Sequence, residues 1–441
     1  MSKKVRIGIA GFGTVGSGVA KIILENADKI ENRTGIRLDL ARVVDIDTKS
    51  PRPVQLPAGL LVDDMDALLK DDTIDIGVEL IGGTDYARQL QIDMLKSGKD
   101  VVTANKALLA THGSELNKAA HENNKCIAFE ASCAGGIPIV SAIRTGLAAN
   151  NIRAIYGILN GTCNYILTSM TAEGAGFREV LKEAQDKGYA EADPTLDING
   201  GDTAHKLAIL GSLAFGKQIE LEDIFIEGIE NIKLEDVNYG KELGYVLKLL
   251  AIAEKTPEGK ISLRVHPSFL SKDNPLARVD GSFNAVSIFG NAVGNTMYYG
   301  RGAGMMPTAS AVVADIIEVA LGNSSNLFKA QTLESREETI ASLESIDNTV
   351  NRFYIRLLAK DVPGTFAKYA RILGENGISI SGALQHEDHK EGSGVGVIVT
   401  THQAQQSKID AALNQIKDLD VIEGDPVCIR IIDIPEDDLE D

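Results

Sequence analysis

Short apolar runs alternate with helical patterns along the first 130 residues of the chain. The strand-like runs are VRIGIAG, LDLARVVDID, IDIGVELIG, DVVTANK and CIAFEAS, and VAKIILENADKI, YARQLQIDMLKSGK and SELNKAAHENN lie between them with helical spacing. Strands that alternate with helices of this length are typical of a parallel sheet with crossover helices. The pattern predicts an N-terminal α/β domain over residues 1–138, with residues 300–322 packing back on it.

Mixed helical and strand patterns continue beyond this region and predict a second, α+β domain over residues 139–322. Residues 323–350 carry few large apolar side chains and many Ser, Glu and Thr, as a linker does. The order strand, helix, strand, strand, helix, strand follows, which predicts a ferredoxin-like domain over residues 351–431. Residues 432–441 form an acidic tail that is expected to fray.

Composition narrows the classes of protein that the chain can belong to. Its 441 residues predict two to four domains at roughly 100–200 residues each. The 44 Lys and Arg against 62 Asp and Glu give a net charge of −18, which disfavours nucleic acid and anionic membranes as partners. No apolar run approaches the roughly 20 residues that span a bilayer. We therefore expect an unprocessed cytoplasmic protein whose four cysteines are reduced and mostly buried.

The stretch IGIAGFGTVGSGVAKII places Gly11, Gly13 and Gly16 in the G-x-G-x-x-G spacing between a strand and a helix. These glycines allow a tight turn, close approach of a pyrophosphate, and close packing of the helix on the strand. The helix N-terminus adds N–H groups and the positive end of its dipole. The spacing predicts a Rossmann-type dinucleotide site formed by Gly11, Phe12, Gly13, Thr14, Val15 and Gly16. The alternative is a glycine-rich turn without a ligand.

Asp45 ends the next predicted strand, where an acid binds the ribose hydroxyls of NAD. Its distance from the glycines exceeds the usual interval of roughly 20 residues, which we assign to a long helix and the connection ENRTGIRLDL. Lys49 and Arg52 lie close enough in sequence to hold the 2′-phosphate of NADP. The choice between NAD and NADP therefore stays open.

The stretch GYAEADPTLDINGGDTAHKLAIL combines several acids with one lysine. Asp202 and Lys206 are four residues apart and lie on one face of the predicted helix that ends near Gly216. Taken singly, Asp202 is an ordinary N-cap candidate and Lys206 a surface partner. The polar turn DPTLDINGG is longer than a connection between two helices needs, which favours a functional role.

The same stretch resembles the diagnostic pattern of the homoserine dehydrogenase family. The matching positions are Ala184, Gly188, Tyr189, Asp193, Pro194, Asp197, Ile198, Gly200, Asp202 and Lys206. The blocks GFGTVG, VVTANKALLA, FEASCAGGIPI, LNGTCNYIL and GRGAGMMPTASAVVADI resemble other parts of that family in the same order, so the resemblance covers about residues 5–320. It implies the NAD(P)-dependent interconversion of L-homoserine and L-aspartate 4-semialdehyde.

The resemblance also assigns roles to individual residues. Lys206 corresponds to the proton donor and acceptor, and Lys106 to a second lysine that stabilises charge on the reacting oxygen. Glu191 and Asp202 match the residues that bind the substrate, and Asp197 one that supports catalysis. Asp193, which precedes a proline, is expected to make the turn. Further cofactor contacts are assigned to Thr103, Lys106, Gly188, Gly302 and Gly304, the alternative for the last two being close packing before a helix.

FEASCAGGIPI resembles the monovalent-cation loop of the family. The matching positions for Na⁺ or K⁺ are Glu130 with the carbonyls of Cys133, Gly135 and Ile137, and Cys133 and Gly135 are local variants in side chain. Hard cations take oxygen ligands, so backbone carbonyls serve whatever the side chain. A glycine-rich turn without an ion is the alternative.

LLAKDVPGTFAKYARILGENGISISGALQ resembles an ACT domain, the small amino-acid-sensing fold. Its effector loops match Asp361, Pro363, Gly364, Asn376, Gly377 and Ile378. For a homoserine dehydrogenase the implied effector is L-threonine, and the implied assembly is a homodimer or homotetramer. An ACT domain that only forms dimers is the alternative.

Two other classes of protein compete with this interpretation. A thiol-acylating aldehyde dehydrogenase would use Cys163 as its nucleophile, but no matching His motif accompanies it. A catalytically inactive amino-acid sensor would combine the same Rossmann-type and ACT parts.

Overall fold

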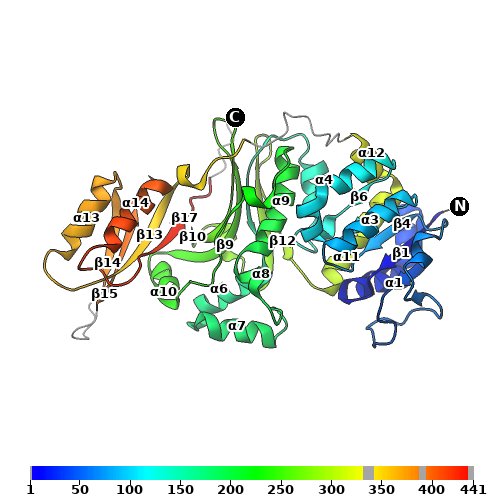
Figure 1. Cartoon of the computed structure of the whole chain (residues 1–441), viewed down its shortest axis with the longest axis horizontal. Helices are drawn as coiled ribbons and strands as arrows, with labels where there is room; N and C mark the ends of the chain where they lie inside the picture. Colours follow the sequence, from blue (N-terminus) through cyan, green and yellow to red (C-terminus); the bar gives the residue numbers. More distant parts are fainter. Residues whose placement is uncertain (1, 331–341, 387–393, 436–441) are drawn as a thin grey trace. The chain divides into compact units, whose positions relative to one another are not determined.

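The computed structural model (Figure 1) describes residues 2–330, 342–386 and 394–435. By its internal packing the chain divides into two compact units. The first unit comprises Met1–Ile152, Thr203–Asp223 and Phe283–Ala341. The second comprises Arg153–Asp202, Ile224–Ser282 and Ser342–Asp441. Each unit is therefore assembled from three separate stretches of sequence.

The first unit contains a six-stranded, fully parallel sheet in the order β3-β2-β1-β4-β5-β6. Its strands are β1 (Lys3–Ala10), β2 (Ile36–Val44), β3 (Leu61–Val62), β4 (Ile76–Glu79), β5 (Asp100–Thr103) and β6 (Ile127–Ala128). Strand β4 is buried throughout and β1 is buried over its second half, as strands covered on both faces are. The strand order reverses direction at β1, and ligands bind at such switch points, beyond the carboxyl ends of the strands. The predicted Rossmann-type sheet is confirmed.

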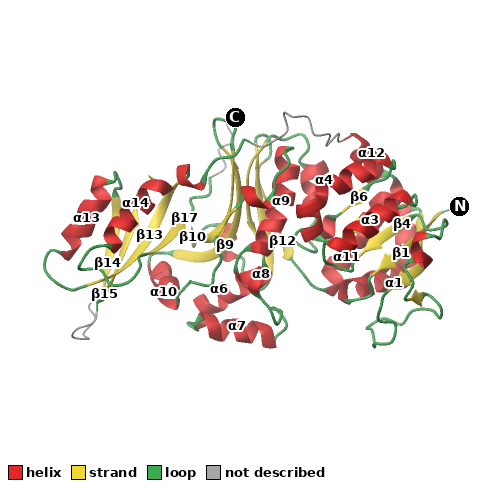
Figure 2. Ribbon diagram, in the orientation of Figure 1, coloured by secondary structure: helices red, strands yellow, loops and turns green. Residues whose placement is uncertain are grey.

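Helices pack against this sheet and complete its hydrophobic core (Figure 2). They are α1 (Thr14–Thr34), α2 (Asp66–Leu69), α3 (Asp85–Lys96), α4 (Lys106–Glu122), α11 (Met305–Leu321) and α12 (Asn323–Ala330). Helix α11 packs against α1, because Gly18 lacks the side chain that would collide with Ala309 at 2.8 Å. Residues 300–322 were predicted to pack back on the N-terminal domain. Their helix α11 does pack against α1, the first helix of that domain.

The remaining elements of the first unit are further helices and one hairpin. The helices are η1 (Glu130–Ser132), α5 (Ile139–Ser141), η2 (Ala142–Gly146), the part of α9 (Gly201–Phe215) from Thr203 onward, and η3 (Leu221–Asp223). The hairpin consists of β11 (Phe283–Gly290) and β12 (Gly294–Arg301), paired antiparallel.

The structure differs from the sequence-based expectation in the predicted linker. Residues Asn323–Ala330 form helix α12, and Phe328 is 4% exposed within the core of the first unit. The hydroxyl of Ser325 also lies 3.3 Å from Cys126 Sγ, and composition alone did not reveal these contacts. Residues 331–341 of the linker and 436–441 of the acidic tail lie outside the described residues.

The second unit is built on a mixed sheet in the order β7-β9-β10-β17-β13-β15-β14. Its first strands are β7 (Ile152–Ile158), β8 (Phe225–Ile226), β9 (Tyr245–Lys255) and β10 (Ile261–Ser271). Its helices before the C-terminal part are α6 (Gly161–Glu173), α7 (Phe177–Asp186), α8 (Thr195–Ile198), α10 (Leu234–Glu242) and η4 (Pro275–Arg278).

The C-terminal part of the second unit has the predicted ferredoxin-like order. After η6 (Ile346–Asn348) come β13 (Val350–Ala359), α13 (Thr365–Glu375), β14 (Ile380–Gln385), β15 (Val395–Thr401), β16 (Ala404–Gln405), α14 (Gln406–Lys417) and β17 (Val427–Ile431). Its own core includes Phe353, Tyr369 and Ile409. Its sheet is not separate, because β17 pairs in parallel with β10 at Ser268 and Phe269. Sequence patterns predict strands but not which edges join, so this continuity was not foreseen.

Among the described residues, no single helix is long and apolar enough to cross a membrane, although the bent pair α11 and α12 reaches that composition together.

Candidate active site

The three glycines of the loop between β1 and α1 serve two purposes: some are required by the fold, and one leaves room for a ligand. Gly11 has a φ of +99°, and a Cβ there would lie 2.6 Å from the carbonyl oxygen of Leu80. A Cβ on Gly16 would lie 2.0 Å from the carbonyl oxygen of Gly11. A Cβ on Gly13 would meet nothing within 4 Å. The fold itself therefore requires the outer two glycines, while the middle one leaves open space at the start of α1 where a pyrophosphate fits.

Asp45 lies beside this loop, as predicted from its place after β2. Its Oδ2 accepts a hydrogen bond from the backbone N–H of Phe12 at 2.5 Å, and its Oδ1 accepts one from Asp47 at 2.9 Å. The Arg52 guanidinium is 3.8 Å from Asp45 and 3.5 Å from Asp47. The long interval from the glycines arises because α1 extends to Thr34. The loop thus has an acid and a cation at the position expected for the adenosine ribose.

Glu79, which sequence reasoning missed, organises the neighbouring edge of the sheet. It is fully buried at the end of β4, and its carboxylate accepts from Gln91 at 2.9 Å and from the hydroxyl of Thr103 at 2.8 Å. It also accepts from the backbone N–H of Ile81 at 2.9 Å. An acid at the end of an otherwise apolar strand was the available signal. The side chain of Thr103 is fully buried too, so it shapes this edge from inside.

Lys106 begins helix α4 directly after the same edge. The N-cap of α4 is Asn105, whose side chain accepts from the N–H of Leu108 at 3.2 Å and donates to the carbonyl of Gly83 at 2.7 Å. These bonds fix the loop that carries Lys106, and its side chain is half-buried. The predicted second lysine therefore lies at the carboxyl end of β5, at the edge where doubly wound folds bind ligands.

Lys206 lies in α9, and a cysteine of the predicted cation loop contacts its backbone. The side chain of Lys206 is 8% exposed, and Cys133 Sγ is 3.9 Å from its carbonyl oxygen. Two residues on, a Cβ on Gly135 would lie 2.4 Å from the carbonyl oxygen of Gly302. The next element, α11, touches α1 at Gly18. The first unit thus brings Lys206, the cation loop, the GRGAG turn and the start of α1 together through successive contacts.

The side chain of Glu130 takes part in the fold of the predicted cation loop. Its carboxylate accepts from the N–H groups of Val140 and Ser141, each at 2.8 Å, and from the Ser141 hydroxyl. It therefore caps the start of α5. The backbone N–H of Glu130 donates to Asp315 at 2.7 Å, and burial raises the pKa of Asp315 well above its ordinary value.

No alternative metal site emerges elsewhere: over residues 2–330, 342–386 and 394–435, no three His, Cys, Asp or Glu side chains are grouped to hold an ion.

In the second unit, Asn160 joins two of the predicted acids. Its Nδ2 donates to Asp197 Oδ1 at 2.7 Å and to Asp202 Oδ2 at 2.8 Å. Its Oδ1 accepts from the N–H of Cys163 at 2.8 Å and so caps α6. The Cys163 thiol in turn donates to the carbonyl of Asp197 at 3.2 Å. Two carboxylates are thereby held side by side by one donor, and a pair of anionic groups suits a cationic partner.

Asn160 was the second residue that sequence reasoning missed. It lies in the block LNGTCNYIL, directly before helix α6. The sequence alone did not show that its side chain contacts two acids. In the same stretch as Asp197 and Asp202, Glu191 is exposed, and its carbonyl accepts from Gln185 at 3.1 Å. Asp193 accepts from the Thr195 hydroxyl at 2.6 Å and makes the turn, as predicted.

Gly188 ends helix α7 in the left-handed conformation, with a φ of +74° and no atom within 4 Å of a Cβ placed there. Like Gly13, it leaves space that the protein does not fill.

The two predicted effector turns lie at the ends of α13. Asp361 and Pro363 are exposed, and Gly364 starts the helix with a φ of +91°. Asn376 directs its side chain back to the carbonyl four residues earlier, at 2.8 Å. Ile378 is 3% exposed and belongs to the domain core. The first turn therefore presents side chains to solvent, whereas those of the second are committed to the fold.

All four cysteines are free, and the three that precede residue 200 are buried. Cys163 is fully buried, so its thiol supports Asp197 instead of facing a substrate.

Nearly the whole chain is similar to known proteins. The family model described as homoserine dehydrogenase matches residues 138–317, and that of the homoserine dehydrogenase NAD binding domain matches residues 11–130. The ACT domain model matches residues 353–420.

Individual relatives extend the same similarity. The homoserine dehydrogenase of Neisseria gonorrhoeae is 40% identical over 432 residues, covering 97% of this chain and 99% of its own. The crystal structure of a homoserine dehydrogenase from Thiobacillus denitrificans superposes with a TM-score of 0.90 at 41% identity, covering 98% of this chain and 99% of that one. A hyperthermophilic archaeal homoserine dehydrogenase mutant in complex with NADPH matches 72% of this chain and 98% of its own, with a TM-score of 0.60 at 30% identity.

Proposed function

The chain belongs to the homoserine dehydrogenase family, and on that premise we propose that it interconverts L-homoserine and L-aspartate 4-semialdehyde. The observation that carries the proposal is the pair of carboxylates held by Asn160. The substrate is an amino acid, so its ammonium group needs an anionic partner when it leaves water. A pair of oriented carboxylates supplies one. The proposed place of the reaction is the cytoplasm, in the biosynthesis of threonine, methionine and isoleucine.

Within this proposal the residues divide the work of binding and proton transfer. Asp202 and Glu191 bind the substrate ammonium, and Asp197 supports the chemistry from beside Asp202. Lys206 takes the hydroxyl proton during oxidation and returns it during reduction, and Lys106 stabilises charge on the same oxygen. The nicotinamide supplies the hydride acceptor or donor when bound. The open space at Gly13 and the N-terminus of α1 support its binding through the pyrophosphate.

We propose NAD or NADP as the cofactor. Asp45 suits the 2′-hydroxyl of NAD, and Arg52 beside it suits the 2′-phosphate of NADP. The NADPH complex of the archaeal relative supports NADP as a candidate.

We further propose a Na⁺ or K⁺ ion bound by Glu130 with the main-chain carbonyls of Cys133, Gly135 and Ile137. The left-handed conformations of Ala134 and Gly135, each with a φ of +52°, make a turn that can direct carbonyls inward. Its test is the melting temperature of the protein in NaCl, KCl and tetramethylammonium chloride at equal ionic strength. Equal melting temperatures in all three salts would contradict the ion.

We propose L-threonine as the effector of the ACT domain and a homodimer or homotetramer as the assembly. Threonine is an end product of the proposed pathway, and the turn at Asp361 presents polar groups to solvent. Inhibition by threonine and the mass in solution, measured by light scattering with and without threonine, test both statements.

The decisive experiment is an assay of absorbance at 340 nm with homoserine and each cofactor in turn. We expect turnover in the ordinary enzyme range of about 1–1,000 per second with at least one cofactor. Lys206→Met should lower kcat by about 100-fold or more, because general acid and base catalysis contributes about that much. Lys118→Met, which changes an exposed lysine of α4, is the matched control. Wild-type protein without turnover would favour the inactive amino-acid sensor.

A further inference from the structure

Strands β8 and β17 share one edge of β10. Strand β9 pairs along the full length of β10 and so occupies its other edge. On the shared edge, β8 pairs in parallel at Arg264 and Val265, and β17 at Ser268 and Phe269. The end of β8 and the C-terminal strand of the ACT domain are therefore placed next to each other along one strand.

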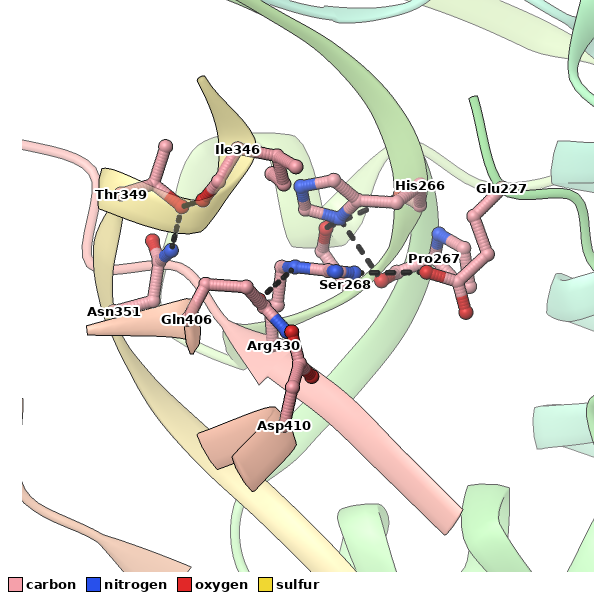
Figure 3. A network of polar contacts seen from close by, with 10 residues as sticks. All are labelled: Glu227, His266, Pro267, Ser268, Ile346, Thr349, Asn351, Gln406, Asp410 and Arg430. Carbon is pink, nitrogen blue, oxygen red and sulfur yellow. Dashed lines mark hydrogen bonds and ion pairs between the residues drawn. The ribbon is translucent and has the colours of Figure 1, made fainter. Parts of the chain in front are cut away.

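Arg430 of β17 connects the two across this junction. Its Nη1 is 2.8 Å from Glu227 Oε2, and its Nε donates to Gln406 Oε1 of α14 at 2.9 Å (Figure 3). The guanidinium also lies 5.1 Å from the ring centroid of Phe225. Arg430 is 6% exposed. A charge this buried depends on its hydrogen-bonded partners, so the pair with Glu227 is constrained in position.

Glu227 begins a segment that packs directly on α8. Its N–H donates to Val265 at 2.8 Å, and two residues on the N–H of Ile229 donates to the carbonyl of Ile198 at 2.8 Å. A Cβ on Gly228, between them, would lie 2.3 Å from that same carbonyl oxygen. Ile198 is the last residue of α8 and follows Asp197. The backbone next to Asp197 is thus in direct contact with the backbone next to Glu227.

We propose that Arg430 of the ACT domain is a positioning residue, which through Glu227 holds residues 227–229 against α8 and so fixes the placement of Asp197. This inference rests on the proposed function, because it assigns to the ACT domain a direct mechanical role in the substrate site. The chain of contacts is short: Gln406, Arg430, Glu227, Ile229 and Ile198 lead from helix α14 to Asp197. An effector that shifts α14 relative to β17 changes the same contacts.

The test uses Arg430→Met and Glu227→Gln in the full-length protein, with Arg352→Met as the matched control. Arg352 lies on β13 of the same ACT sheet, where it donates to the hydroxyl of Tyr245 in β9 at 2.8 Å and lies 3.4 Å from Asp433. For both test variants we expect kcat/KM for homoserine to fall about 5-fold or more, the lower range of measured couplings between sites. The KM for the nicotinamide cofactor should not change. Arg430→Lys, which keeps the charge, should lose less than Arg430→Met.

A second measurement does not depend on activity. Hydrogen exchange, followed by mass spectrometry, should accelerate in peptides covering residues 194–200 in Arg430→Met and Glu227→Gln, and should stay at the wild-type rate in Arg352→Met. The double variant should exchange no faster than Arg430→Met, because both changes break one contact. Glu227 is 42% exposed in its side chain, so Glu227→Gln still decides the matter if Arg430→Met does not fold.

The outcomes separate the two proposals. If Arg430→Met and Glu227→Gln behave like Arg352→Met in exchange and in kinetics, the positioning role is wrong. If wild-type protein shows no homoserine turnover but the exchange differences appear, the positioning role stands and the proposed function is wrong.

Discussion

The side-chain amide of Asn160 donates to the carboxylate of Asp202 at 2.8 Å, although 42 positions separate the two residues in sequence. The same nitrogen donates to Asp197, and Asn160 also caps the helix that follows it. One neutral side chain thus orients two acids without cancelling their charge. A pair of acids oriented in this way suits the cationic group of a substrate.

Replacing Asn160 by Asp tests this arrangement with little change in shape. Aspartate keeps the cap of α6, because its oxygen accepts from the N–H of Cys163 as Asn does. It removes both donated hydrogen bonds, each worth about 1.5–3 kcal/mol when the partner is charged. We expect kcat/KM for homoserine to fall at least about 10-fold and the melting temperature to fall as well, because a third carboxylate then lies beside the other two. Asn123→Asp, at the end of α4, is the control for the chemical change, and wild-type kinetics in Asn160→Asp would refute the role.

Gly13→Ala and Gly16→Ala should separate ligand binding from folding. Gly13 has a φ of −71° and open space around it, so Gly13→Ala should melt like the wild type but raise the KM for the cofactor about 10-fold or more. In Gly16→Ala the new methyl group collides with the carbonyl of Gly11, and overpacking of this kind costs about 1–3 kcal/mol. Thermal melts without cofactor and cofactor titrations distinguish the two. A destabilised Gly13→Ala variant with normal cofactor affinity would contradict this division.

Cys163→Ser should retain activity within about 3-fold, and Cys163→Ala within about 10-fold. The thiol donates one hydrogen bond to the carbonyl of Asp197, and a neutral bond contributes about 0.5–1.5 kcal/mol. Steady-state kinetics with homoserine measure the effect. A thiol-acylating enzyme would instead lose its nucleophile, so near-complete inactivation of both variants would revive that alternative.

Lys248 should make stability rise with pH in the alkaline range. Burial lowers the pKa of Lys248 to about 8, against an ordinary value of 10.5. Between these values the unfolded chain binds more protons than the native one, so the free energy of unfolding increases with pH. The amine still donates to the carbonyl of Val279, at 2.6 Å, when neutral. Urea unfolding at pH 8–10.5 should show a positive slope that Lys248→Met removes, and an identical slope in both proteins would contradict the assignment.

Much of this protein could be predicted from the sequence because the responsible forces act locally. The glycine spacing, the apolar runs of the parallel strands and the turn at Asp193 each depend on backbone conformation or periodicity within a few residues. The family resemblance likewise resides in short blocks. The Rossmann-type sheet, the ferredoxin-like order and the dinucleotide loop therefore needed no tertiary information.

Other features depend on partners that only the folded chain brings together. In the sequence, Asn160 and Glu79 are ordinary polar residues. Only the folded chain places their hydrogen-bond partners, which come from other strands and helices, beside them. The contact of the Glu130 carboxylate with the start of α5 was likewise not visible in the sequence. The Arg430 and Glu227 pair is created by β17 joining the edge of β10. Hydrogen bonds and strand edges are satisfied by whichever group is nearest in space, so the tertiary structure alone decides these contacts.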